Sequence, residues 1–152
     1  MKYQRSTYSC GPASVVNAVR VFGQNVNEYT VRGYAGTDKH GTDENGIMNA
    51  LRELGYSASS YQTDSSNNAW QWLTGQLIHG SPVILCSEAW QHWVVIVGTL
   101  GDRVVLIDSS NTKRNRKENG VKILTKTQLI RTWHNARKNI EGRLYAIAVG
   151  KK

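Results

Sequence analysis

Three short runs rich in β-branched residues limit the folds open to this chain. They cover residues 83–86, 93–97 and 103–107, and each is bounded by turn residues. Runs of this length and composition are typical of buried strands rather than of helices. The second and third runs are joined by residues 98–102, which include two glycines and suit a hairpin. We therefore expect consecutive antiparallel strands in this part of the chain.

Helical periodicity dominates the first half of the chain instead. Val15, Val19 and Phe22 lie three or four residues apart, and Pro12 suits the first turn of a helix. Helices are predicted at residues 12–22, 27–35, 42–54, 65–79 and 127–137, and further strands at 56–61, 121–124 and 144–149. Helices followed by an antiparallel sheet are typical of the α+β class, which is the predicted fold class.

The length of the chain favours one domain. Its 152 residues are enough for a real core and few for two domains, and no repeat divides them, so a single domain over residues 1–152 is expected. The first residues lack the apolar core of a secretory signal peptide, and no stretch approaches the roughly 18 apolar residues of a membrane span. Two cysteines do not make a disulfide framework. A cytoplasmic location is the expectation.

Cys10 stands directly before Gly11 and Pro12, at the expected start of the first helix. A thiolate in that position is stabilised by the helix dipole. Because an ordinary thiol is only a few per cent ionised at neutral pH, a nucleophilic cysteine needs such a setting together with a base. Cys10 is therefore the candidate nucleophile. Cys86 lies within an apolar run and is most simply a small core residue.

Four histidines could supply the base. His40 lies in a loop, His79 at a helix end and His134 on a helix, and a lone histidine in such places is usually structural or merely exposed. His92 differs because it stands at the entry of the strand over residues 93–97. It is the favoured partner of the thiol.

A hairpin would bring a second polar group to His92. Folding residues 103–107 back along the preceding strand places Asp108, or a residue shortly after it, near the imidazole. An acid in that position fixes the tautomer of the ring and stabilises its cation. Asn111 is the alternative orienting residue. The side-chain amide of Gln4 could join the backbone N–H of Cys10 in stabilising an oxyanion.

Several short blocks in this sequence occur in a recognisable order. They are Gln4, Cys10-Gly11-Pro12-Ala13, Gly41-Thr42, residues 51–56, residues 80–84, residues 92–98 and Asp108. In this order the chain resembles the papain-like cysteine peptidases of the double-glycine leader (bacteriocin-processing) family and their stand-alone relatives. The resemblance spans almost the whole chain. It implies a papain-like α+β fold in which an N-terminal helix carrying the cysteine packs on an antiparallel sheet carrying the histidine and the aspartate.

The resemblance also implies a Cys-His-Asp catalytic triad and an acyl-enzyme mechanism. Cys10 would be the nucleophile, His92 the general base and acid, Asp108 the residue that orients His92, and Gln4 the oxyanion donor. The family often has proline directly after this aspartate, whereas two serines follow it here. Its leader peptidases cleave after a Gly-Gly pair and are usually fused to a membrane transporter.

Two tryptophans flank the candidate base. Trp90 or Trp93 could form a wall of the substrate groove, although at least one of them is expected in the core. Two widely spaced cysteines and scattered histidines do not match the spacing of a zinc site. No glycine-rich phosphate loop is present in the sequence either. We therefore expect neither a metal nor another cofactor.

The net charge of +8 favours anionic partners. The densest basic run of the sequence contains Lys113, Arg114, Arg116 and Lys117. This segment has no apolar periodicity and is expected to be a solvated loop. These side chains could dock an acidic protein. Nucleic acid is a less favoured partner.

The favoured function is that of a thiol protease: hydrolysis of a peptide or protein substrate, with small residues such as Gly-Gly before the cleaved bond. The same acyl chemistry would serve deamidation, transamidation or thioester cleavage. The competing class is a catalytically silent, peptidase-like module that binds an acidic protein or nucleic acid through its basic surface. Such a module would bind in a strongly salt-dependent manner and would be indifferent to substitution of Cys10.

Overall fold

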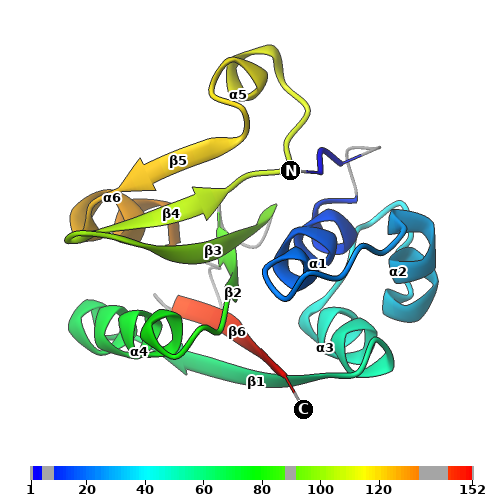
Figure 1. The fold of residues 1–152 in the computed structure, drawn as a ribbon, viewed down its shortest axis with the longest axis horizontal. Helices are drawn as coiled ribbons and strands as arrows, with labels where there is room; N and C mark the ends of the chain where they lie inside the picture. Colours follow the sequence, from blue (N-terminus) through cyan, green and yellow to red (C-terminus); the bar gives the residue numbers. More distant parts are fainter. Residues whose placement is uncertain (1, 5–8, 88–91, 134–143, 152) are drawn as a thin grey trace.

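The computed structural model describes residues 2–4, 9–87, 92–133 and 144–151 (Figure 1). The helices are α1 (Cys10–Arg20), α2 (Glu28–Ala35), α3 (Glu44–Glu53), α4 (Ser66–Ile78), α5 (Lys113–Lys117) and α6 (Lys126–Trp133). The strands are β1 (Tyr56–Thr63), β2 (Val83–Ser87), β3 (His92–Leu100), β4 (Arg103–Ile107), β5 (Val121–Leu124) and β6 (Leu144–Lys151). They form one antiparallel sheet in the order β1-β6-β2-β3-β4-β5. The predicted α+β class is confirmed.

Strands β3 and β4 form the predicted hairpin. Leu100 pairs with Arg103, so the connection is the two-residue turn Gly101-Asp102, which is shorter than the sequence suggested. Gly101 has a φ of 62°, a left-handed conformation that glycine adopts at little steric cost. The register ends with Val95 opposite Ile107. The residues that follow β4 therefore lie beside the start of β3.

Alternation of side chains along the strands builds a core on each face of the sheet. Cys86 and Val95 pack with α1, α2 and α3 on one face, while Leu85 and Val94 pack with α4 and α6 on the other. Figure 1 shows these two groups of helices flanking the sheet. The predicted packing of the N-terminal helix against an antiparallel sheet is confirmed.

Helix α1 is fixed at its N-terminal end against the sheet. Every residue from 10 to 19 is buried, which is unusual for a helix with one apolar stripe. The hydroxyl of Ser14 donates a hydrogen bond to the backbone oxygen of Trp93 over 3.0 Å. A Cβ on Gly11 would lie 2.9 Å from Cβ of Thr42, so a larger residue at position 11 would push the two segments apart. These contacts hold the start of α1 close to the start of β3.

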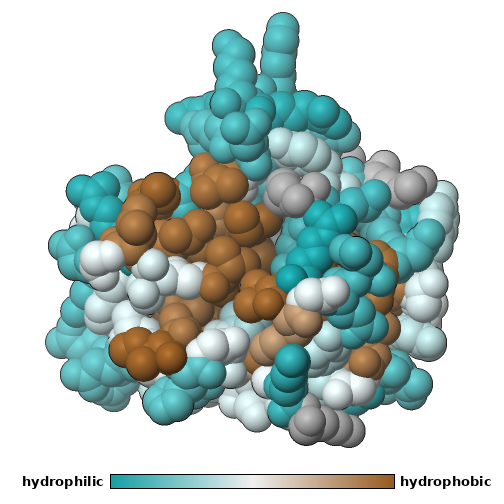
Figure 2. All heavy atoms as spheres, viewed as in Figure 1, coloured by the Kyte–Doolittle hydropathy of each residue, from teal (hydrophilic) through white to brown (hydrophobic). Residues whose placement is uncertain are grey.

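The helices leave part of one sheet face uncovered. Val121 is 36% exposed and Ile123 45%, and both lie on β5, beyond the edge of α1. A cavity of about 260 Å³ lies between α1 and the β3–β4 pair, lined by Asn17, Arg20, Val21, Val97 and Ile107. Figure 2 shows apolar side chains gathered on this side of the molecule. The result is an exposed apolar surface next to the helix that carries Cys10.

The basic run over residues 113–117 is a short helix, α5, so the prediction of a loop was wrong. Thr112 caps the helix, because its side-chain oxygen accepts a hydrogen bond from the backbone N–H of Asn115 over 3.1 Å. Asn115 itself is only 4% exposed and anchors the turn. The predicted end of the helix over residues 127–137 lies outside the described residues. None of the helices that the structure describes is long and apolar enough to span a membrane.

Candidate active site

The thiol of Cys10 and the imidazole of His92 meet where α1 and β3 both begin. Cys10 is the first residue of α1 and is 6% exposed, and His92 is the first residue of β3 and is 9% exposed. The thiol is close enough to raise the pKa of the imidazole through hydrogen bonding and charge. The fold thus places a buried thiol at a helix N-terminus with an imidazole as its direct neighbour.

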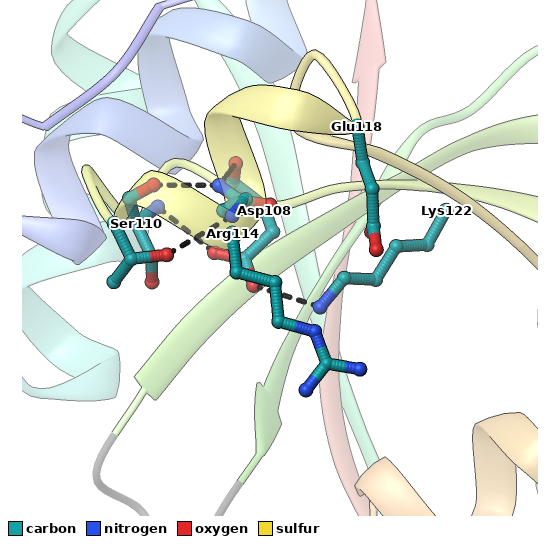
Figure 3. Close-up of a pocket in the computed structure, with 7 residues that line it drawn as sticks. Asp108, Ser110, Arg114, Glu118 and Lys122 are labelled. Atoms are coloured by element: carbon teal, nitrogen blue, oxygen red, sulfur yellow. Dashed lines mark hydrogen bonds and ion pairs between the residues drawn. The ribbon is translucent and has the colours of Figure 1, made fainter.

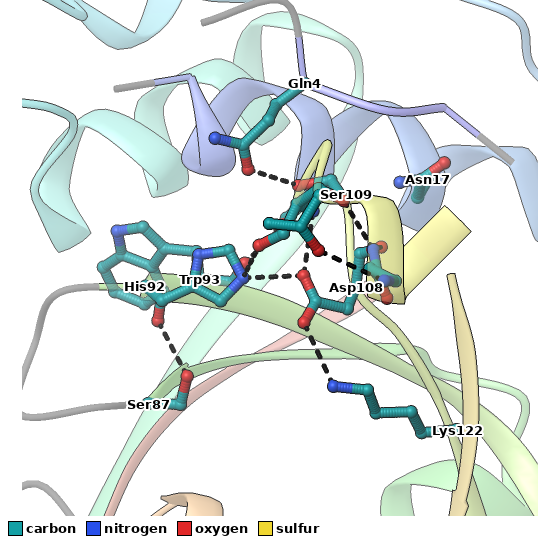
Figure 4. A network of polar contacts seen from close by, with 12 residues as sticks. Gln4, Asn17, Ser87, His92, Trp93, Asp108, Ser109 and Lys122 are labelled. Carbon is teal, nitrogen blue, oxygen red and sulfur yellow. Dashed lines mark hydrogen bonds and ion pairs between the residues drawn. The ribbon is translucent and has the colours of Figure 1, made fainter. Parts of the chain in front are cut away.

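Asp108 reaches His92 from the end of β4. Its Oδ1 lies 2.8 Å from Nε2 of the imidazole (Figure 4). The sequence left Asn111 as an alternative, but the side chain of Asn111 instead accepts a hydrogen bond from Nε of Arg116. Asp108 therefore contacts the imidazole through Nε2.

The imidazole and the carboxylate form a buried ion pair. Burial alone would lower the pKa of His92, but hydrogen bonds with Asp108 and Cys10, and the charges of these groups, outweigh it and raise that pKa from 6.5 to about 10. Burial would likewise raise the pKa of Asp108, yet the hydrogen bond with His92, its charge and the hydrogen bonds of Ser110 hold that pKa well below its ordinary value. His92 is therefore a cation at neutral pH. A cation beside a thiol favours the thiolate, which is the nucleophilic form.

The two serines after Asp108 take part in the same network. The backbone N–H of Ser110 donates to Oδ1 of Asp108 over 2.9 Å, and its hydroxyl lies 3.1 Å from Nε2 of His92. Ser109 is 1% exposed, and its hydroxyl donates to Oε1 of Gln4 over 3.1 Å. The segment that carries the carboxylate therefore also contacts the imidazole and Gln4.

Gln4 lies beside this segment and is 9% exposed. Its backbone N–H donates to the backbone oxygen of Ser109 over 2.9 Å, in addition to the side-chain contact. Figure 4 shows the side-chain oxygen of Gln4 turned toward Ser109 and the amide nitrogen on the opposite side. The structure brings Gln4 into the network of His92 and Asp108, although these residues are far apart in the sequence.

Asn115 holds the segment from the other side. Its amide nitrogen donates to the backbone oxygens of Asp108 over 2.9 Å and of Ser110 over 2.6 Å. Sequence reasoning missed the contributions of Ser109, Ser110 and Asn115. No periodicity marks these polar residues. The one available signal was the pair of serines where the family often has proline.

The outer side of Asp108 faces a polar cavity of about 420 Å³ (Figure 3). Nζ of Lys122 lies 3.6 Å from Oδ2 of the carboxylate, and Arg114 and Glu118 line the same cavity. The predicted partner-binding residues Lys113, Arg114, Arg116 and Lys117 are all exposed on α5. The basic side chains of Arg114 and Lys122 therefore line a cavity that borders Asp108.

The remaining candidates lie elsewhere or are part of the core. Trp93 is 4% exposed, and its Nε1 donates to the backbone oxygen of Thr42 over 2.9 Å. This placement fits the core interpretation and gives the groove-wall role of Trp93 no support. Trp90 and His134 lie outside the described residues. The other two histidines, His40 and His79, are exposed.

Cys86 is fully buried among apolar side chains, as the sequence suggested, and both cysteines are free thiols. Among residues 2–4, 9–87, 92–133 and 144–151, no group of three or more His, Cys, Asp or Glu side chains is arranged to hold a metal ion. The chemistry that this arrangement supports is nucleophilic attack by a thiolate, with an imidazolium beside it to supply a proton.

Comparisons with known proteins agree with this geometry. A sequence model described as the Peptidase C39 family matches residues 1–136. The chain is 26% identical over 114 residues to the lactococcin-G-processing and transport ATP-binding protein LagD of Lactococcus lactis subsp. lactis. That match covers 73% of this chain and only 15% of the LagD protein.

Two solved structures show the same fold. The peptidase domain of Streptococcus ComA, a bi-functional ABC transporter involved in a quorum sensing pathway, superposes with a TM-score of 0.70 at 18% identity, covering 99% of this chain and 97% of that one. A double glycine motif protease from an AMS/PCAT transporter, solved in complex with the leader peptide, gives a TM-score of 0.73 at 18% identity, covering 99% of this chain and 89% of that one. The papain-like architecture is confirmed.

Proposed function

The chain belongs to the Peptidase C39 family, and from this premise we propose that it cleaves peptide bonds through an acyl-enzyme formed on Cys10. The observation that carries the proposal is the buried contact of His92 with both Cys10 and Asp108. Three groups from α1, β3 and the end of β4 converge in this arrangement. A structural ion pair would need only two of them.

The proposed reaction begins with attack of the Cys10 thiolate on the carbonyl carbon before the cleaved bond. The new C–S bond pushes the carbonyl electrons onto oxygen, where the backbone N–H of Cys10 and the amide of Gln4 stabilise the charge. As the carbonyl re-forms and the C–N bond breaks, His92 gives its proton to the leaving amine. His92, now neutral, takes a proton from water, which attacks the thioester and releases the free thiolate and an acid. Asp108 keeps the imidazole oriented throughout.

The proposed substrate is a peptide with small residues, such as Gly-Gly, before the cleaved bond. LagD is described as a processing protein, and the AMS/PCAT protease was solved with a leader peptide. The exposed apolar surface near Val121 and Ile123 gives such a peptide a place to bury apolar side chains next to α1. A leader segment that ends in Gly-Gly and carries apolar residues upstream fits both features.

The decisive experiment compares wild type with two variants on a peptide that contains a Gly-Gly site. Wild type and Cys86→Ser should cleave it after the second glycine, whereas Cys10→Ala should lose at least about 10³-fold in rate. A peptide chloromethyl ketone should alkylate Cys10 in wild type and in Cys86→Ser, with loss of chloride, and intact-mass spectrometry detects the stable thioether. Equal cleavage by Cys10→Ala would contradict the proposal.

A second candidate function rests on the exposed lysines and arginines of α5, which lie beside the polar cavity. As a catalytically silent module, the protein would bind an acidic protein, or less favourably nucleic acid, through this surface. Binding would weaken steeply with salt and would be the same in wild type and Cys10→Ala. Deamidation or transamidation by the same three residues would instead appear as Cys10-dependent release of ammonia without a broken peptide bond.

A further inference from the structure

We propose that Ser109 is a positioning residue that orients the side-chain amide of Gln4 toward the oxyanion. The inference deepens the proposed function and rests on it, because an oxyanion forms only if Cys10 attacks a carbonyl. Ser109 itself touches no reacting atom in this scheme. It acts through Gln4.

Two hydrogen bonds join Ser109 and Gln4. The hydroxyl of Ser109 donates to Oε1 of Gln4 over 3.1 Å, and the backbone oxygen of Ser109 accepts from the backbone N–H of Gln4 over 2.9 Å. Ser109 is 1% exposed and Gln4 is 9% exposed, so bulk water competes little for either contact. The backbone contact sets where Gln4 lies, and the side-chain contact sets which way its amide faces.

The direction of the amide matters because its two ends differ in chemistry. A glutamine amide carries two N–H donors at one end and only acceptor lone pairs at the other. An oxyanion is stabilised by the nitrogen end and repelled by the oxygen end. Since Ser109 occupies the oxygen end, the nitrogen end faces the other way, as Figure 4 shows. Without the hydroxyl, a half-turn of the amide would no longer break this hydrogen bond.

Ser109 is itself held in place by its neighbours. Asn115 binds the backbone oxygens of Asp108 and Ser110 over 2.9 and 2.6 Å, on both sides of Ser109. The backbone N–H of Asp108 also donates to the backbone oxygen of Gly120 over 2.8 Å. The short segment that fixes the imidazole through Asp108 thereby fixes the amide of Gln4 through Ser109. The positions of the proton donor and the oxyanion donor are coupled by three consecutive residues.

A double-mutant cycle tests the role of Ser109. Ser109→Ala should lower kcat by about tenfold, which is less than the roughly 10²–10³-fold lost when an oxyanion donor is removed outright, and should leave KM and the pH profile unchanged. In the Gln4→Ala background, Ser109→Ala should cause no further loss, because the residue acts only through Gln4. Losses that multiply independently in the double variant, or a change confined to KM, would overturn the inference. Ser110→Ala is the matched control, since its hydroxyl contacts His92 and its loss should alter the pH profile.

A second measurement does not require peptidase activity. In ¹⁵N-labelled protein, the side-chain amide signals of Gln4 are identified by their absence in Gln4→Ala. Ser109→Ala should shift or broaden these signals while Ser110→Ala leaves them in place, and alkylation of Cys10 by iodoacetamide should be equally fast in wild type and Ser109→Ala. Unchanged Gln4 signals in Ser109→Ala would overturn the inference whether or not the protein cleaves peptides. A folded wild type with no Cys10-dependent reaction would overturn the proposed function instead.

Discussion

The two oxygens of the Asp108 carboxylate face different surroundings. Oδ1 lies 2.8 Å from a histidine that is 9% exposed and also accepts a backbone hydrogen bond. Oδ2 lies 3.6 Å from Lys122, whose side chain is 40% exposed beside an open polar cavity. Both contacts join a carboxylate to a basic group, but water screens only the second. The two contacts differ in burial and in the number of hydrogen-bond partners, and not in charge. These two properties distinguish a contact suited to catalysis from an ordinary surface ion pair.

The contacts of Oδ1 and Oδ2 should differ most in their effect on enzymatic activity. Asp108→Ala removes the group that orients His92 and leaves a buried imidazole without its partner, so kcat/KM should fall on the order of 10²-fold. Asp102→Ala, at the exposed turn of the β3–β4 hairpin, is the matched control and should be close to wild type. Steady-state kinetics on the Gly-Gly peptide provides the measurement. Similar losses of kcat/KM in both variants would contradict a special role for Asp108.

The pH dependence of stability should reflect the buried contact between His92 and Asp108, and not the exposed contact with Lys122. Because the pKa of His92 is raised from 6.5 to about 10, its contribution is fully present below pH 6.5 and is lost as the pH rises toward 10. Because the pKa of Asp108 is held below 3.8, its contribution is present above that pH and is lost on acidification. The free energy of unfolding of wild type minus that of Asp108→Asn should therefore be largest near pH 4 to 6.5 and shrink above it. Urea titrations across this range measure it, and a flat difference would contradict the ion pair.

Asn115, which holds the backbone on both sides of Ser109, should matter mainly for stability. Asn115→Ala leaves the backbone oxygens of Asp108 and Ser110 without their buried donor, which should cost about 1–3 kcal/mol in the free energy of unfolding. Asn111→Ala is the exposed control and should cost under about 0.5 kcal/mol. Thermal or urea unfolding distinguishes the two. An Asn115 variant as stable as the control would show that the segment holds its shape without α5.

The contact between Lys122 and Asp108 should have the smallest effect on stability and activity. Lys122→Met removes an ion pair that is 3.6 Å long and partly exposed, so the free energy of unfolding should change by less than about 1 kcal/mol. Activity should stay near the wild-type level, because Oδ1 still holds His92. Raising the salt concentration should narrow even this small difference. A loss comparable with that of Asp108→Ala would mean that Lys122 belongs to the site.

The parts of this structure that sequence could predict are those with a repeating pattern. The hairpin of β3 and β4 was predictable because β-branched residues flank a glycine-containing turn, and a hairpin fixes which residue must come near His92. The predicted candidates Cys10, His92, Asp108 and Gln4 lie in one polar network. Their catalytic roles stay predictions until the variants are measured.

What sequence could not predict depends on single polar contacts. Ser109 and Asn115 stabilise the site through hydrogen bonds to residues that pattern rules do not pair with them. The helix α5 was missed because one capping threonine and one buried asparagine define it, with no apolar stripe. The pairing of β1 with β6 joins segments that are far apart in the chain, and periodicity carries no information about such partners.

That pairing has a consequence for the order in which the protein assembles. Strand β6 lies between β1 and β2 and is hydrogen-bonded to both. During synthesis, the hairpin of β3 and β4 can form early, whereas β1, which among the described strands pairs only with β6, stays unpaired until residues 144–151 have left the ribosome. The two parts of the sheet then close around β6. The contact between α1 and β3, and with it the meeting of Cys10 and His92, does not wait for this step, because it involves neither β1 nor β6.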